Sequence, residues 1–328
     1  MPAKRPVITS VQPLRAVEGG RVSLSGSGLP VEPLPVVTIG GEPARVLFAS
    51  PARIVIQVPS DLEPGRAALR IDGLPGDSFF VTIGGNWATG LHQVDNPVFD
   101  RQGNLFVTYS GSRGQESPVS IFRVTPAGTR EPFASGIVNA TSMAIGPDDA
   151  LYVSSRFEGT VYRVAADGSH QQVGSELGVA CGLAFDADGW MYVGDRSGTV
   201  FRVRDGRATA FATLPPSVAA FHLAMSPEQE LFVTAPTLAP YDHVFRIGRT
   251  GEVTALPTPF GRPQGLAFSP DGVLHVVDAL AGAGGVYRIK PLDATPELAV
   301  SGSALIGLAF GPSGQLVVVS NDTAYRFE

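Results

Sequence analysis

The sequence is poor in cysteine, in charged residues and in long apolar runs. Its 328 residues include one cysteine, Cys181, so no intramolecular disulfide framework can form. Charged residues make up 16% of the chain, the formal net charge is −6, and no run of Lys or Arg occurs. Because a nucleic-acid-binding protein normally carries a basic stripe, we expect no nucleic-acid partner.

The apolar residues are dispersed, and no uninterrupted stretch of them is long enough to span a bilayer. We therefore expect no membrane partner. Residues 1–6 are not followed by an apolar stretch of signal-peptide length. These features predict a soluble cytoplasmic protein, although a secreted chain from which the signal had been removed would look the same.

Glycine and proline are abundant, with 39 and 28 residues, and they show neither collagen-like periodicity nor low-complexity tracts. Such an excess indicates many tight turns, and with few charges it favours an all-β protein. The length allows two domains, since single cores seldom exceed roughly 250–300 residues.

A short apolar string recurs at intervals of 40 to 46 residues, starting at Leu105, Leu151, Met191, Leu231, Leu274 and Leu316. A second string with a central Arg follows each one, as in Phe122-Arg123-Val124, and a third precedes it, as in Gly182-Leu183-Ala184-Phe185. Asp-Gly pairs between the strings are strong hairpin signals. Six such units of four antiparallel strands predict a six-bladed β-propeller over residues 85–328.

The last repeat stops at Glu328 after its third strand, so its fourth strand must come from elsewhere. Residues 85–94, around Trp87 to Gln93, directly precede the first blade and are expected to supply it. Closing the ring in this way would leave no unpaired sheet edge.

Residues 1–84 lack the repeat but contain strand-like runs separated by Gly/Pro turns. Pro6-Val7-Ile8, Gly19-Gly20-Arg21-Val22, Val37-Thr38-Ile39-Gly40-Gly41 and Val58-Pro59 fall in the order typical of IPT/TIG domains. The segment therefore resembles an IPT/TIG domain, an immunoglobulin-like β-sandwich. The resemblance implies a structural or interaction module, and so a candidate protein partner for the sandwich.

The phase of the repeats places the long, irregular loops on one rim of the propeller, where we expect a small-molecule ligand at the axial mouth. Inner strands begin there at Asp95-Asn96, Cys181-Gly182, Phe221-His222 and Gln264-Gly265. The candidate ligand-binding residues at these starts and in the loops are Asn96, Arg113, Asn139, Arg156, Glu158, Cys181, Arg196, Tyr241, His243 and Gln264.

A catalytic interpretation makes His222 a general base, with Asp95 or Asp242 orienting it and an arginine stabilising negative charge. The structural alternative makes His222 a satisfied polar residue of the tunnel wall. Three other blades have Gly at its position, so we expect His222→Ala to cost little stability. His275 replaces the aromatic of its repeat and is expected to be packed.

From Asp95 onward, the rhythm of Gly-Leu-Ala-Phe, Asp-Gly, Tyr-Val and Asp resembles the NHL-repeat and gluconolactonase/regucalcin propellers. The resemblance implies a hydrolase of a small cyclic ester. Open alternatives are a non-catalytic NHL-type propeller that binds a ligand or protein, and a propeller lyase.

The resemblance implies a divalent metal at the axis, as in gluconolactonases. Asp95 is the nearest equivalent of their glutamate ligand, but the other corresponding positions are Cys181, Phe221 and Gln264, a degenerate set for calcium. We therefore expect no metal. A shifted site from Asp95, Asn139, Cys181 and His222 is the alternative, and it would suit zinc better than calcium. The cofactor stays open.

Overall fold

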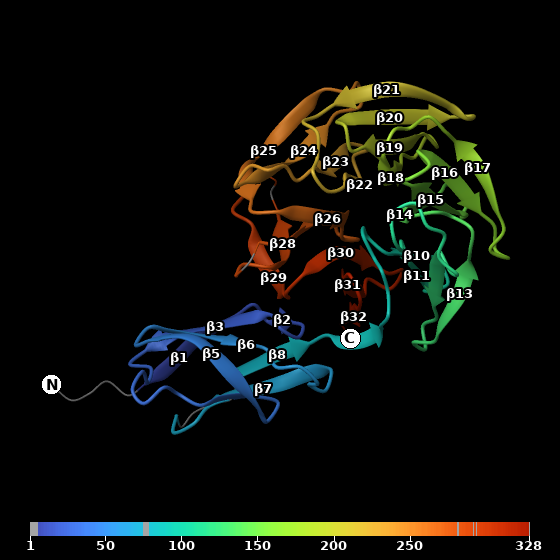
Figure 1. Ribbon diagram of the computed structural model, residues 1–328. Coiled ribbons are helices and arrows are strands. Elements are labelled where there is room, and N and C mark those ends of the chain that lie inside the picture. The colour runs from blue at the N-terminus through green and yellow to red at the C-terminus, as the bar shows by residue number, and fades with distance from the viewer. Residues whose placement is uncertain (1–5, 75–78, 281, 291, 293, 328) are drawn as a thin grey trace.

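The computed structural model describes residues 6–74, 79–280, 282–290, 292 and 294–327, in which β-strands build a sandwich beside a six-bladed propeller (Figure 1). Within these residues there is no helix long and apolar enough to cross a membrane. Both parts follow from the turn-rich, strand-forming sequence, and the predicted all-β class is confirmed.

Each blade is a four-stranded antiparallel meander with its first strand at the axis. Blade 1 consists of β10 (Val98–Phe99), β11 (Leu105–Thr108), β12 (Ile121–Val124) and β13 (Arg130–Ala134). Blade 2 consists of β14 (Ala140–Ile145), β15 (Leu151–Ser155), β16 (Thr160–Val164) and β17 (His170–Gly174). Blade 3 consists of β18 (Ala180–Phe185), β19 (Met191–Asp195), β20 (Thr199–Arg204) and β21 (Arg207–Thr213). Blades 4 and 5 consist of β22 (His222–Met225), β23 (Leu231–Thr234), β24 (Asp242–Ile247) and β25 (Val253–Phe260); β26 (Pro263–Phe268), β27 (Leu274–Asp278), β28 (Gly285–Ile289) and β29 (Glu297–Ser301).

Blade 6 is built from both ends of the propeller sequence: β30 (Leu305–Phe310), β31 (Leu316–Ser320), β32 (Ala324–Arg326) and β9 (Gly85–Ala88). Strand β9 pairs antiparallel with β32, with Ala88 opposite Ala324 and Gly85 opposite Arg326. The next residues continue the attachment, since the amides of Leu91 and Gln93 donate to the carbonyls of Asp322 and Asn321. The ring is thus closed by hydrogen bonds between residues far apart in the sequence.

The propeller core is a set of apolar clusters, one at each junction between neighbouring blades. Alternate residues of the second and third strands point into these junctions, as Val193 of blade 3 does toward blade 2 and Val233 of blade 4 toward blade 3. Both side chains are fully buried. Hydrophobic burial between neighbouring blades therefore stabilises the ring, and polar side chains can lie at the axis.

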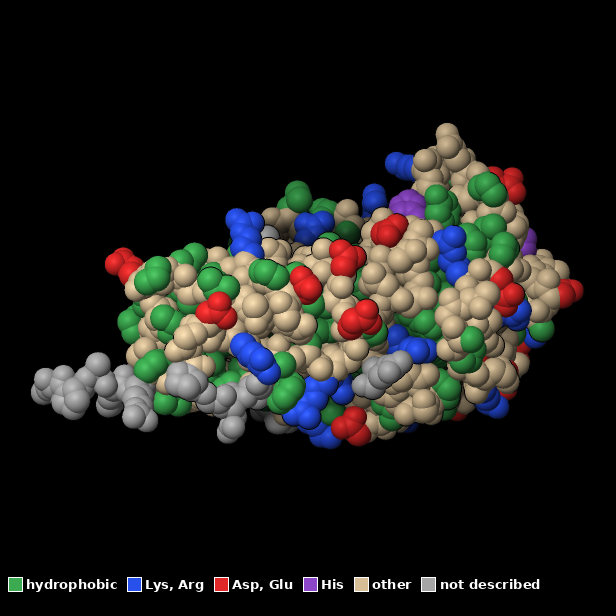
Figure 2. Space-filling model, turned by 90° about the horizontal axis from the view of Figure 1, so that it is seen from below, with side chains coloured by type: hydrophobic (Ala, Val, Ile, Leu, Met, Phe, Trp, Pro, Cys, Tyr) green, Lys and Arg blue, Asp and Glu red, His purple; other side chains and the backbone are tan. Residues whose placement is uncertain are grey.

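The sandwich consists of one sheet of β1 (Val7–Gln12), β3 (Arg21–Ser27), β6 (Arg53–Gln57) and β5 (Glu42–Ser50), and a second of β4 (Val37–Ile39), β7 (Gly65–Ile71), β8 (Phe79–Ile83) and β2 (Arg15–Ala16). Its core is fully buried at Leu24, Ile39, Ile54 and Ile56. Figure 2, seen from the sandwich side, shows the apolar side chains on this surface scattered among polar and charged ones.

The sandwich is joined to the propeller by a continuous sheet. The two-residue strand β2 pairs in parallel with β29, the outer strand of blade 5, through Ala16 and Ser301. The Ser301 hydroxyl accepts from the amide of Arg21 at 2.6 Å, and the Tyr325 hydroxyl donates to Glu18 at 2.8 Å. Val17 is fully buried in the cluster between blades 5 and 6. This contact makes the sandwich part of the propeller's own packing.

The loops between second and third strands share one rim of the propeller with the connections between blades. Carboxylates at the strand ends hold these loops: Asp195 accepts from the amide of Val179 at 2.8 Å, and Asp278 accepts from those of Gly261 and Arg262 at 3.0 and 2.8 Å. We call this side the loop rim. Backbone amides donate to Asp195 and Asp278, so these two carboxylates serve the scaffold.

Candidate functional site

The inner strands approach one another closely at the axis, and glycines make this approach feasible. A Cβ on Gly182 would lie 2.6 Å from the carbonyl oxygen of Phe221, and one on Gly307 would lie 2.7 Å from that of Asp95. A Cβ on Gly265 would lie 2.1 Å from Oδ1 of Asn96. These three positions leave no room for side chains, and Asp95, Asn96 and His222 lie beside them at the axis.

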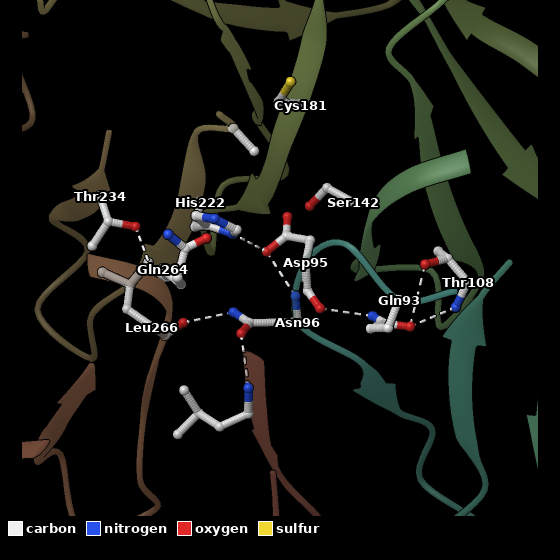
Figure 3. A network of polar contacts seen from close by, with 12 residues as sticks. Gln93, Asp95, Asn96, Thr108, Ser142, Cys181, His222, Thr234, Gln264 and Leu266 are labelled. Carbon is white, nitrogen blue, oxygen red and sulfur yellow. Dashed lines mark hydrogen bonds and ion pairs between the residues drawn. The ribbon is translucent and has the colours of Figure 1, made fainter. Parts of the chain in front are cut away.

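The centre of the site is a buried pair between Asp95 and His222 (Figure 3). Oδ1 of Asp95 lies 2.5 Å from Nδ1 of His222 and also accepts from the amide of Asn96 at 2.7 Å. The two residues are 1% and 0% exposed. Oδ2 of Asp95 and Nε2 of His222 have no hydrogen-bond partner within the part of the chain that the structure describes.

Asn96 and Gln93 fasten the segment that carries Asp95. Nδ2 of the Asn96 side chain donates to the carbonyl of Leu266 at 2.8 Å, and Oδ1 of the same side chain accepts from the backbone amide of Leu308 at 3.0 Å. Gln93 donates to the carbonyl of Asp95 at 2.7 Å and accepts from the amide of Thr108 at 2.7 Å. Asn96 therefore bridges the inner strands of blades 5 and 6, which engages both ends of its amide.

Cys181, Gln264 and Ser142 surround the pair, as Figure 3 shows. Ser142 points toward the free oxygen of Asp95, whereas the sulfur of Cys181 lies apart from the pair. Burial raises the pKa of the Cys181 thiol to about 11, so the side chain is a neutral thiol at neutral pH. The Cys181 carbonyl accepts from the Ser154 hydroxyl at 2.9 Å.

The structure places several candidate residues in loop-holding roles. The Asn139 amide donates to the carbonyls of Ser110 and Ser112 at 2.6 and 2.9 Å and accepts from the amide of Gly114 at 2.7 Å. Asp242 accepts from the amide and hydroxyl of Thr237 at 3.0 and 2.7 Å. Of the two carboxylates considered for His222, Asp95 is therefore the one in contact.

Three further candidates lie in the outer loops and strands. Glu158 is exposed and accepts from the Tyr162 hydroxyl at 2.9 Å. His243 lies on the third strand of blade 4, with Nδ1 2.7 Å from the carbonyl of Leu256. Tyr241 is exposed at the end of the same blade's loop. None of them contacts the Asp95–His222 pair.

The described residues contain no group of three or more His, Cys, Asp or Glu placed to hold a metal ion. Of the alternative metal set, Asn139 is committed to a loop and the Cys181 sulfur lies apart from Asp95 and His222. The residues present do not fit the divalent metal that the gluconolactonase resemblance implies.

Arg113, Arg156 and Arg196 lie on the loop rim, in the loops that follow the second strands of blades 1, 2 and 3. Burial lowers the pKa of Arg156, and the charges of Arg196 and Arg113 lower it further. Burial lowers the pKa of His92, and the charge of Arg156 lowers it further. Within the described residues, none of the three guanidinium groups makes an ion pair or a hydrogen bond.

Sequence reasoning did not single out Gln93, Thr108 and Thr234 as members of this network, although all three are fully buried. The Thr234 hydroxyl donates to the carbonyl of Gln264 at 2.5 Å. A polar residue such as Thr108 or Thr234 within an apolar strand indicates that its side chain needs a hydrogen-bond partner, but the sequence does not show which residue that partner is.

Residues 6–84 match the family model described as IPT/TIG domain. This segment is an IPT/TIG domain. A second model, strictosidine synthase-like, N-terminal, matches residues 182–203 in blade 3. Curated proteins give no match to the sequence.

Solved structures similar to the chain share the fold at low sequence identity. An auxiliary nutrient binding protein from Bacteroides thetaiotaomicron has 12% identity and a TM-score of 0.58, and the alignment covers 99% of this chain and 98% of that one. A gluconolactonase from Xanthomonas campestris has 15% identity and a TM-score of 0.62, covering 86% and 99%. Virginiamycin B lyase from Staphylococcus aureus has 16% identity and a TM-score of 0.52, covering 73% and 86%.

Proposed function

We propose that this chain is a non-catalytic binding propeller that holds a small anionic molecule at the axial mouth of the loop rim. The observation that carries the proposal is that Arg113, Arg156 and Arg196 lie on neighbouring loops of one rim, that the charges of Arg196 and Arg113 act on Arg156, and that none of the three has an ion-pair partner among the described residues. Like charges held together repel one another, and a bound anion would offset that repulsion. Guanidinium groups also suit carboxylate and phosphate through paired N–H donors.

The floor of the mouth supports binding more than chemistry. Asp95 and His222 are buried, and in the part of the chain that the structure describes they belong to no group of three or more His, Cys, Asp or Glu that could hold a metal ion. The similarity to the nutrient binding protein extends over both the IPT/TIG domain and the propeller, since the alignment covers 99% of this chain and 98% of that one. A binding role for the whole two-domain chain is consistent with that coverage.

Isothermal titration of the full chain with small carboxylates and phosphates tests the proposal. Arg156→Gln is expected to weaken binding about 10- to 100-fold, because a charge-assisted contact contributes roughly 1.5–3 kcal/mol. Arg262→Gln is the matched control: Arg262 lies on the same rim, is exposed, and is not among the charges acting on Arg156. Equal affinities of wild type and Arg156→Gln, or no binding of any anion, would refute the proposal.

A second candidate is hydrolysis or elimination with His222 as general base. The observation favouring it is the Asp95–His222 contact, which orients the ring through Nδ1 and leaves Nε2 free of protein partners among the described residues. Wild-type turnover on a panel of lactones and esters tests it. Turnover that falls about 10²–10⁴-fold in folded His222→Gln would support this candidate, and a rate equal to that of buffer would reject it.

A further inference from the structure

The large apolar side chains that the described propeller exposes gather on the loop rim. They are Phe157 (53% exposed), Val218, Leu238 (89%), Tyr241 (61%) and Leu280. The exception is Val253, at the turn end of β25 on the opposite rim. Phe157 lies in the loop of blade 2, and the other four lie on the loops and connections of blades 4 and 5.

The loop of blade 4 that carries Leu238 and Tyr241 is held by hydrogen bonds at its base. Asp242 accepts two hydrogen bonds from Thr237, and the amide of Val218 donates to the carbonyl of Pro236 at 3.0 Å. The exposed side chains are therefore presented by an anchored loop. Clustered apolar surface on an ordered loop is a mark of a binding site.

The apolar and the cationic loops face each other across the mouth. In a six-bladed ring, blades three apart are opposite, so blade 1 faces blade 4 and blade 2 faces blade 5, as Figure 1 shows. Arg113 of blade 1 thus stands opposite Leu238 and Tyr241, and Arg156 of blade 2 stands opposite Leu280. The arginines of blades 1 to 3 are therefore opposite most of the exposed apolar side chains, while Phe157 and Glu158 lie beside Arg156 and Arg262 lies in the connection into blade 5.

We propose that the ligand is an amphipathic anion, a carboxylate or phosphate carried on an apolar body several carbons long. This inference rests on the proposed function and names its ligand class. The anionic group meets the arginines of blades 1 to 3, and the apolar body covers the side chains of blades 4 and 5. Charge complementarity would stabilise the anionic group beside the arginines, and hydrophobic burial would stabilise the apolar body on blades 4 and 5.

Titration of the full chain with butyrate, hexanoate and octanoate tests the apolar contact. Each CH₂ that becomes buried is expected to increase affinity roughly two- to fourfold, so octanoate should bind at least about tenfold more tightly than butyrate. 1-Octanol, which has the chain without the charge, should bind much more weakly than octanoate.

Two sets of variants separate this inference from the proposed function. The double substitution Leu238→Ser, Tyr241→Ser should flatten the dependence on chain length while butyrate affinity is kept, and Arg156→Gln should weaken every acid. Val253→Ser, an exposed apolar residue on the opposite rim, is the control and should change nothing.

Arg156-dependent binding with equal affinity for butyrate and octanoate would overturn this inference and leave the proposed function standing. Chain-length-dependent binding that survives Arg156→Gln would overturn the proposed function, and with it the anionic half of the ligand. A dependence on chain length that persists in the Leu238→Ser, Tyr241→Ser protein would place the apolar contact elsewhere and also overturn the inference.

Discussion

Nδ1 of His222 and Oδ1 of Asp95 lie 2.5 Å apart at the centre of the propeller, joining blade 4 to the segment that enters blade 1. These blades are opposite each other, and the two residues are 127 positions apart in the sequence. The pair is a direct side-chain link across the axis, at a level where glycines bring the neighbouring strands together.

We expect His222→Ala to destabilise the protein by about 3–5 kcal/mol, because it leaves a buried carboxylate with one amide donor. Urea unfolding followed by circular dichroism measures the change. His243→Ala is the control, since His243 is half-buried and contacts one carbonyl, and it should cost under about 1.5 kcal/mol.

The double variant Asp95→Ala, His222→Ala completes a cycle for this pair. We expect it to cost less than the sum of the single variants, with a coupling of roughly 0.5–3 kcal/mol. Additive single effects would mean that the contact contributes no stability of its own.

From the sequence we expected the opposite for His222, because three blades have Gly at its position. Those glycines indicate close approach: a Cβ at Gly182, Gly265 or Gly307 would overlap neighbouring atoms. Residue identity at one phase of a repeat therefore does not tell whether a side chain is dispensable. The neighbour that excludes or requires it comes from another blade, which the repeat alone does not describe.

The propeller itself could be predicted because each blade repeats the same local signals, apolar strings and Asp-Gly turns, at a regular interval. The phase of the repeat also placed Asp95 and His222 at the same axial level. It could not separate them from Asn139 and Asp242, which share that rim but hold loops. A polar residue beside a loop can bind backbone or ligand, and only the coordinates show which.

The docking of the IPT/TIG domain could not be predicted for a different reason. It depends on the two-residue strand β2 and on Val17, which are too short a signal to distinguish from a turn. The parallel pairing of Ala16 with Ser301 joins distant parts of the chain.

This docking changes what truncation should do. Removing residues 1–84 keeps β9 but takes away β2 and the buried Val17, and it exposes the edge of blade 5. We expect a folded propeller with a lower melting temperature than the full chain. Removing residues 1–94 also takes β9 and Gln93, so this protein should not fold cooperatively.

Thermal unfolding of both truncated proteins checks the expectation. Loss of a cooperative transition in the protein lacking residues 1–84 would show that the sandwich, and not β9 alone, is required to close the ring. Equal melting temperatures of the two truncated proteins would show that β9 contributes nothing to closure.

Cys181 should be almost unreactive toward Ellman's reagent in the native protein at pH 8. Its side chain is 1% exposed, and burial raises its pKa to about 11, so both access and thiolate are lacking. The same protein in denaturing urea should release one equivalent of chromophore, which serves as the control. Rapid, stoichiometric reaction of the folded protein would show that the blade 3–blade 4 junction opens readily.

His275 should make the protein less stable in mild acid. Its ring packs on Phe310 with centroids 4.9 Å apart, and it stands where the repeats of other blades have Tyr or Phe. Burial lowers its pKa from the ordinary value of 6.5, and Arg288 and Arg15 lower it further, while the carbonyl of Val273 and Asp271 oppose the shift. At pH 8 the ring is neutral in both states, so it contributes no pH dependence there.

As the pH falls below 6.5, the unfolded chain takes up a proton on His275 that the folded protein resists, and stability is lost. The loss continues until the pH reaches the lowered pKa of the folded state, with a slope of at most about 1.4 kcal/mol per pH unit for one proton. His275→Phe keeps the ring packing and removes this proton. Urea unfolding of both proteins at pH 8, 7, 6 and 5 should therefore show the variant gaining on wild type as the pH decreases, whereas a difference that is constant with pH would mean that His275 titrates equally in both states.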